Sequence, residues 1–114
     1  MKSKMDLEKL FNSLPPDEKS SVITHGMAFY ISSLKKRLFL AEAKLKQFEN
    51  KYHTTIEKVD SEGLPDNANY EMHEDYVMWH HWNDTSQKLK NRIKSLLRAG
   101  DIELALSEEL NASD

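Results

Sequence analysis

Cysteine is absent from this chain of 114 residues. Its absence excludes disulfides, thiolate nucleophiles and every zinc or iron–sulfur site that is built on cysteine. It is compatible with a reducing cytoplasm, where disulfides are rare. Any metal site would therefore have to be built from histidine and carboxylate side chains.

Glycine is scarce, and its three copies, Gly26, Gly63 and Gly100, stand alone and far apart. Loops that cradle phosphate need several glycines in a short motif, and so does the turn that presents a catalytic serine in hydrolases of the Gly-x-Ser-x-Gly type. The chain contains neither motif. Its sequence therefore offers no phosphate-binding loop and no serine nucleophile in a recognisable setting.

Long apolar runs are absent as well, because no stretch approaches the roughly 20 residues that cross a bilayer. Residues 1–6 lack the apolar core of a secretory signal. Hydrophobic residues make up 39% of the chain and charged residues 31%, which is typical of one soluble domain. We expect a cytoplasmic protein that does not associate with membranes.

Two stretches carry apolar residues at alternating steps of three and four, which places them on one side of a helix. The first seam comprises Met27, Ile31, Leu34, Leu38, Ala41, Leu45, Phe48 and Tyr52. The second seam comprises Met72, Tyr76, Trp79, Trp82, Ser86, Leu89, Ile93 and Leu96. Since the turn-forming run 62–67 separates them, the pattern predicts an all-α, antiparallel, coiled-coil-like hairpin of two long helices.

Start and stop signals divide the chain into five expected helices within a single domain, residues 1–114. Pro15 and Pro16 separate the first two helices, and Thr54 with Glu57 forms a capping box for a short helix at the tip. Gly63 and Gly100 are expected helix ends. The expected helices span residues 5–14, 16–52, 54–61, 69–99 and 102–110. We expect Gly26, inside the second of these, to allow close approach of a neighbouring backbone.

A second set of apolar residues lies partly off the first seam, so a lone hairpin would leave it uncovered. These residues are Phe29, Tyr30, Phe39 and Leu40. A dimer that forms a four-helix bundle is the simplest cover for them. The two terminal helices also need a surface for their apolar faces, which carry Leu7, Leu10 and Phe11 at one end and Ile102 and Leu106 at the other. All nine residues are candidates for binding a partner.

Charge is segregated along the predicted hairpin. Residues 57–75 hold seven acids and one lysine, whereas residues 88–98 hold five basic residues and no acid. If Tyr52 lies opposite Met72, the basic run 35–37 lies across from about Lys88. The candidate basic patch comprises Lys35, Lys36, Arg37, Lys88, Lys90, Arg92 and Lys94. This patch could hold a nucleic-acid backbone. The net charge of −3 and the acids elsewhere in the chain instead favour pairing of these basic residues with acids of the same chain or of a protein partner.

Histidines and carboxylates are densest in residues 71–84. Helical ligands for one metal ion lie three or four residues apart, and His80 with Asp84 is a pair with the correct step. Such a pair would need two further ligands from elsewhere. The simpler interpretation is that Trp79 and Trp82 belong to the core and that the histidines form a polar rim.

Two segments resemble a group of small prokaryotic helical-hairpin proteins, some of which are similar to antitoxin-like partners in toxin–antitoxin gene pairs. The segments read FENKYHTTIE at residues 48–57 and YEMHEDYVMW at residues 70–79. In that group an aromatic residue and Lys-Tyr-Gly end one helix, a capped short helix follows, and an acidic stretch leads into a tryptophan. The resemblance covers about residues 40–97 and implies no catalytic residue. His53 stands where the group favours glycine.

The sequence therefore predicts a non-catalytic protein-interaction module without a cofactor, which forms a homodimer and binds a protein partner that the sequence does not identify. The resemblance implies the antitoxin-like half of a gene pair. One alternative is a nucleic-acid-associated protein that uses the basic patch. A second is a metal-dependent helical-bundle enzyme, which would need His80 and nearby acids to gather on one ion.

Overall fold

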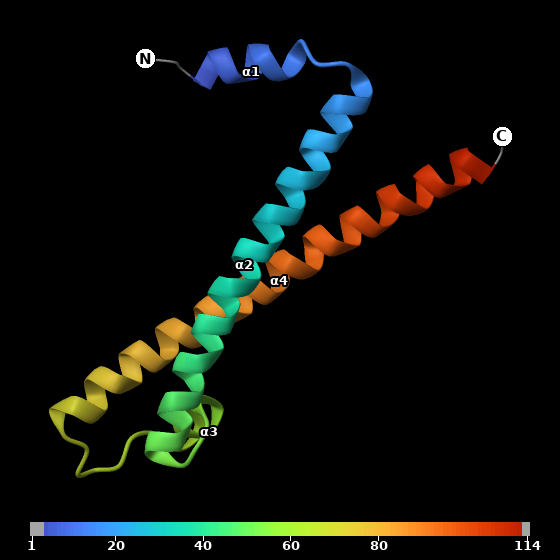
Figure 1. The fold of residues 1–114 in the computed structure, drawn as a ribbon. Coiled ribbons are helices and arrows are strands. Elements are labelled where there is room, and N and C mark those ends of the chain that lie inside the picture. The colour runs from blue at the N-terminus through green and yellow to red at the C-terminus, as the bar shows by residue number, and fades with distance from the viewer. Residues whose placement is uncertain (1–3, 113–114) are drawn as a thin grey trace. The chain divides into compact units, whose positions relative to one another are not determined.

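The computed structural model describes the backbone of residues 4–112 and the side chains of residues 6–100. Within residues 4–112 it contains four α-helices and no strand, which confirms the all-α prediction. The helices are α1 (Lys4–Asn12), α2 (Pro16–Tyr52), α3 (Ile56–Glu62) and α4 (Tyr70–Ala112) (Figure 1). None of these helices, over the residues described, is apolar enough over a sufficient length to span a membrane.

The chain divides after Ser33 into two compact units. The first unit contains α1 and the beginning of α2. The second contains the rest of α2, α3 and α4. Burial explains the division, because the first buried side chain along the described part of the chain is Leu34.

In the first unit, helix boundaries follow the two prolines. Pro16 occupies the first helical position of α2, where its missing N–H costs no hydrogen bond, and Asp17 and Glu18 lie in the positive first turn. The Pro15 carbonyl accepts a hydrogen bond from the Lys19 amide at 2.9 Å. A Cβ added at Gly26 would meet no described atom within 4 Å, so the expected close approach of a backbone is not observed.

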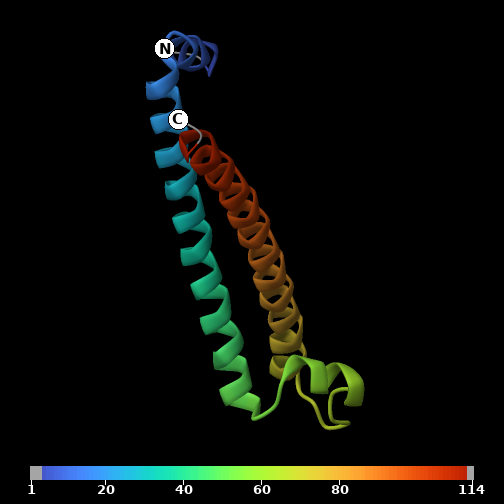
Figure 2. The ribbon, with the colours of Figure 1, turned by 90° about the vertical axis from the view of Figure 1, so that its right-hand side faces the viewer.

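In the second unit, α4 runs antiparallel beside the later part of α2 (Figure 2). Leu34, Leu89 and Ile93 form a buried cluster, and Leu38 and Leu96 pack against it. Toward the tip, Lys51 of α2 contacts Asp75 of α4. Residues later in α2 thus contact residues earlier in α4, which defines the antiparallel direction.

The two seams account for most of this burial. Every member of the second seam is buried or half-buried, and so is every member of the first except Met27, which is 38% exposed. Ala41 and Ser86 are fully buried, and the Ser86 hydroxyl donates to the Asn83 carbonyl of its own helix at 2.9 Å. At the tip, the Tyr52 hydroxyl donates to Asp75, which lies about one helical turn beyond Met72.

The short helix α3 starts one residue later than the capping box predicts. Thr55, not Thr54, is the N-cap: its backbone is extended, and its hydroxyl accepts from the Lys58 amide. Gly63 ends α3 with a φ of 78° and donates its amide to the Val59 carbonyl, as predicted. His53 has a φ of 53°, so its backbone adopts the left-handed conformation.

The start of α4 is capped by Asn69, whose side-chain oxygen accepts from the Met72 amide at 2.9 Å. Its end does not agree with the expected stop at Gly100. The helix continues to Ala112, so residues 102–110 form part of α4 and not a separate helix. A single glycine weakens a helix by only about 1 kcal/mol relative to alanine, and no proline follows to stop it.

Candidate functional site

The tip of the second unit, residues 48–80, holds most of the specific side-chain contacts in the described part of the chain. Trp79 lies at its centre and is 2% exposed. Its ring stacks on Phe48 at 5.7 Å and on Tyr52 at 5.9 Å between ring centroids. These stacked pairs hold the end of α2 against α4.

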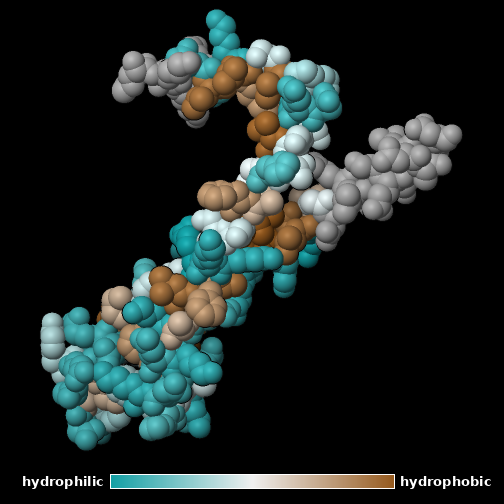
Figure 3. All heavy atoms as spheres, viewed as in Figure 1, coloured by the Kyte–Doolittle hydropathy of each residue, from teal (hydrophilic) through white to brown (hydrophobic). Residues whose placement is uncertain are grey.

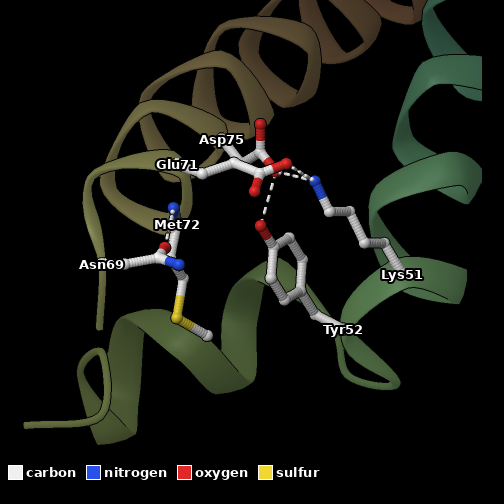
Figure 4. A network of polar contacts seen from close by, with 6 residues as sticks. All are labelled: Lys51, Tyr52, Asn69, Glu71, Met72 and Asp75. Carbon is white, nitrogen blue, oxygen red and sulfur yellow. Dashed lines mark hydrogen bonds and ion pairs between the residues drawn. The ribbon is translucent and has the colours of Figure 1, made fainter. Parts of the chain in front are cut away.

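A network of polar contacts fastens the same helix ends together (Figure 4). Lys51 Nζ lies 2.6 Å from Asp75 Oδ2 and 2.7 Å from Glu71 Oε1. The Tyr52 hydroxyl donates to the same Asp75 oxygen. Hydrogen bonds from Lys51 and then from Tyr52 lower the pKa of Asp75 below its usual value. Asp75 is therefore a charged acceptor between two donors from α2.

The same network changes the acid–base behaviour of its donors. The hydrogen bonds to Asp75 and Glu71 raise the pKa of Lys51 above its ordinary value, with Asp75 contributing most. Burial, followed by the hydrogen bond to Asp75, raises the pKa of Tyr52. Lys51 thus stays protonated, and the Tyr52 hydroxyl keeps the proton with which it binds Asp75.

A second polar cluster attaches α3 to α4. Asp60 of α3 accepts from the Tyr76 hydroxyl and lies 2.6 Å from His80 Nε2. The Tyr76 and His80 rings meet edge to face, with centroids 4.8 Å apart. Hydrogen bonds from Tyr76 and then from His80 lower the pKa of Asp60, and the bond to Asp60 raises the pKa of Tyr76. The cluster holds α3 on α4 while remaining open to solvent.

Beside these contacts lies a cavity of about 200 Å³. Its wall combines side chains of the α2 end, α3, the following loop and the start of α4. The lining residues are Tyr52, Thr54, Val59, Glu62, Gly63, Leu64, Pro65, Met72, Tyr76 and Trp79. The Trp79 Nε1–H is buried and has no hydrogen-bond acceptor among the described residues.

The apolar residues predicted to bind a partner lie at the surface wherever their side chains are described. Phe11 is half-buried. The other six are exposed by between 44% and 78% of their surface, namely Leu7, Leu10, Phe29, Tyr30, Phe39 and Leu40. Figure 3 shows apolar atoms at the surface over α1 and the beginning of α2, in contrast to the hydrophilic tip. The side chains of Ile102 and Leu106 lie outside the described residues.

The seven predicted basic residues are all exposed. Lys88 and Arg92 directly precede the buried residues Leu89 and Ile93. Lys90 and Lys94 directly follow the same two buried residues. Successive residues turn by about 100° around a helix, so the two pairs flank the seam on opposite sides. For the same reason the run 35–37 points in three directions.

Only one of these cations forms an ion pair within the described part of the chain, since Lys90 Nζ lies 3.7 Å from Glu42 Oε1. Both side chains are about half exposed, so this pair contributes little to stability. The expected compensation of the basic residues by acids of the chain is thus limited to Lys90 among the residues that the structure describes.

The candidate metal pair, His80 and Asp84, gains no further ligands from the described side chains. His80 contacts Asp60 and Tyr76, and Asp84 is exposed. Among the side chains of residues 6–100, no group of three or more histidines or carboxylates is placed to hold a metal ion. His80 instead belongs to the polar rim of the tip.

Sequence reasoning did not find the two polar clusters or the cavity. One signal was present, because Glu71 with Asp75 and Tyr76 with His80 are pairs four residues apart, each on one helical face. Their partners, Lys51 and Asp60, come from other helices and depend on the register of the hairpin.

Comparisons of the chain with protein-family models, with curated proteins and with solved structures found no match.

Proposed function

We propose that this protein is a non-catalytic protein-interaction module that acts by covering a partner's surface. The observation that carries the proposal is the lack of burial in the first unit. No side chain among described residues 6–33 is buried, and seven of the large apolar side chains there are exposed. These are Leu7, Leu10, Val22, Ile23, Met27, Phe29 and Tyr30.

The exposure of these side chains gives a partner a substantial source of binding free energy. Phe29 is 78% exposed and Leu7 is 63% exposed. Full burial of a leucine or phenylalanine side chain is worth about 1.5–3 kcal/mol. Amphipathic helices commonly place such side chains in a groove on another protein. The first unit therefore has the composition of a binding element.

We propose that a second copy of the chain covers part of this exposed apolar surface, and that the two copies form a four-helix bundle. In the second unit, Phe39 and Leu40 are 76% and 51% exposed and lie outside the buried cluster that joins α2 to α4. In dimeric four-helix bundles, apolar side chains that lie outside the seam of one hairpin are buried against the second hairpin. The exposed cations of one copy would also attract the acids of the other.

The resemblance of residues 48–57 and 70–79 to antitoxin-like proteins supports a more specific form of the proposal. In that form the dimer is a cytoplasmic, prokaryotic protein that binds the product of a neighbouring gene. Tip contacts such as Lys51 with Asp75 serve to shape the hairpin in this account. No catalytic residue and no cofactor is required.

The proposal is tested by co-expressing the tagged chain with the product of the adjacent gene and purifying the complex at physiological salt. The Phe29→Gln variant removes an exposed apolar side chain, and Ser32→Gln is a matched control at an exposed position of the same helix. We expect the wild type and the Ser32→Gln variant to retain the partner after nuclease treatment. We expect Phe29→Gln to lose most of it.

Equal recovery with both variants, or no recovery with the wild type, would refute the proposed interaction. Recovery that disappears with nuclease would favour the alternative of nucleic-acid association. That alternative is supported by exposed cations that have no acidic partner among the described side chains, such as Lys88 and Lys94. It predicts salt-sensitive binding that Lys88→Glu, Lys90→Glu and Lys94→Glu together abolish.

A further inference from the structure

The second unit carries opposite charge in two separate segments. Residues 57–75, the acidic segment, contain seven acids and one lysine, whereas residues 88–98 of α4, the basic segment, contain five basic residues and no acid. Among the described side chains, Lys90 is the one member of the basic segment that forms an ion pair. Lys51 pairs with two acids of the acidic segment. Each segment therefore keeps a net charge that attracts a surface of opposite sign.

Two exposed apolar bands lie between these charged segments. The α2 band comprises Phe39 and Leu40, which are 76% and 51% exposed. The α4 band comprises Val77 and Met78, which are 63% and 43% exposed. All four side chains lie outside the buried cluster that joins the two helices. A second copy of the chain that covers one band must be placed so that it also covers the other.

Contacts between α2 and α4 show how far apart the two bands lie. Leu34 packs with Leu89 and Ile93, and Lys51 contacts Asp75. Because antiparallel helices have the same rise per residue, these contacts place the α2 band level with about residue 86 of α4. The point midway between the α2 band and the α4 band is then level with about residue 82.

The charged segments have nearly the same centre. The acids in the first turns of α4 are Glu71, Glu74 and Asp75, which centre on about residue 73, and the basic segment centres on about residue 93. Their midpoint is level with about residue 83. Two unrelated properties, charge and apolar exposure, thus share one centre of symmetry along the hairpin.

Charge also decides the direction in which two copies pair. In a parallel pair the acidic segments would lie side by side, and so would the basic segments, which like-charge repulsion disfavours. In a head-to-tail pair with a two-fold axis at the common centre, the acidic segment of each copy meets the basic segment of the other. The same axis brings the α4 band of one copy level with the α2 band of the other.

We propose that two copies pair head to tail through the second unit, about a two-fold axis level with Trp82. The acidic segment of each copy then lies beside the basic segment of the other. This inference rests on the proposed dimer and adds its direction and its register.

Spin labels test the direction, because a chain without cysteine can carry one label at a single introduced cysteine. Tyr70→Cys and Asp84→Cys place the label at exposed positions of α4. Double electron–electron resonance then measures the distance between the two labels of a dimer. Tyr70 lies about 12 residues from the proposed axis and Asp84 about two, so the labels should be about 36 Å and about 6 Å apart along the helices. A parallel dimer would give similar distances at both positions.

Charge reversal tests the register by sedimentation. Lys88→Glu with Lys94→Glu should weaken the dimer about tenfold, because the basic segment would then repel the acidic segment of the other copy. Adding Glu62→Lys and Glu74→Lys to the same chain should restore it. Circular dichroism of each variant confirms retained helix.

The outcomes separate this inference from the dimer itself. A wild-type chain that stays monomeric would overturn both. A dimer with similar label distances at the two positions, or one in which the acid reversals do not rescue the lysine reversals, would overturn the head-to-tail arrangement alone.

Discussion

At the scale of single residues, Trp79 is the side chain on which the tip depends most. It is 2% exposed and stacks on Phe48 and Tyr52, whereas Trp82 is only half-buried. We expect Trp79→Ala to lower the free energy of unfolding by about 3–5 kcal/mol, because it leaves a large void. Trp82→Ala should cost clearly less. Urea unfolding followed by circular dichroism measures both, and equal losses would contradict the central place of Trp79.

Asp75 makes the stability of the tip depend on pH. Its pKa lies below the ordinary value of 3.8 because Lys51 and Tyr52 donate to it. A lowered pKa in the folded state gives stability that is present above the unfolded pKa and is lost as pH falls through the folded pKa. Asp75→Asn should therefore reduce stability at neutral pH, and its difference from the wild type should shrink below about pH 4.

The matched control for this change is Glu74→Gln, at the preceding exposed position, for which the structure gives no ion pair. Thermal unfolding over a series of pH values compares the two variants. A Glu74→Gln variant that loses as much stability as Asp75→Asn would indicate a general effect of charge and not the contact with Lys51.

At the scale of elements, the cap of α3 distinguishes two adjacent threonines. Thr55 accepts from the Lys58 amide at 3.3 Å, while Thr54 lies before the cap. Loss of a threonine cap costs about 1 kcal/mol, so Thr55→Ala should speed hydrogen exchange of the α3 amides roughly fivefold. Thr54→Ala should leave these rates nearly unchanged. Faster exchange in Thr54→Ala than in Thr55→Ala would contradict this assignment and would indicate Thr54 as the N-cap, as the capping box predicts.

The helices and the seams could be predicted because local rules determine them. Pro16 and Gly63 mark helix ends by their backbone preferences, and the spacing of Leu34, Leu89 and Ile93 reflects helical periodicity. Gly100 was assigned as a stop because glycine commonly ends helices, yet α4 passes through it. A single glycine is compatible with either outcome, and its neighbours decide between them.

The tip contacts could not be predicted because they depend on the register between helices. The Tyr52 hydroxyl donates to Asp75, one helical turn beyond Met72, so its partner depends on how the two helices are aligned and on where this long side chain points. The basic residues near Lys90 are a second case, because rotation about the helix places Lys88 and Lys90 on opposite sides of the seam. Side-chain direction, and not composition, determines both outcomes.

At the scale of the whole molecule, the account requires that the exposed apolar side chains find a cover. Phe29 and Phe39 are each more than three-quarters exposed, and residues 6–33 contain no buried side chain among those described. Dimerisation would bury such residues at the centre of a bundle. The first unit should then gain helical order as the dimer forms, because isolated amphipathic helices are marginal in water.

Sedimentation velocity at micromolar concentration tests this central claim most directly. The account predicts a species of twice the chain mass of 13.3 kDa for the wild type and for Ser32→Gln, and a shift toward monomer for Phe29→Gln. A wild-type protein that sediments as a monomer at both low and high salt, with the same helix content as at higher concentration, would contradict it.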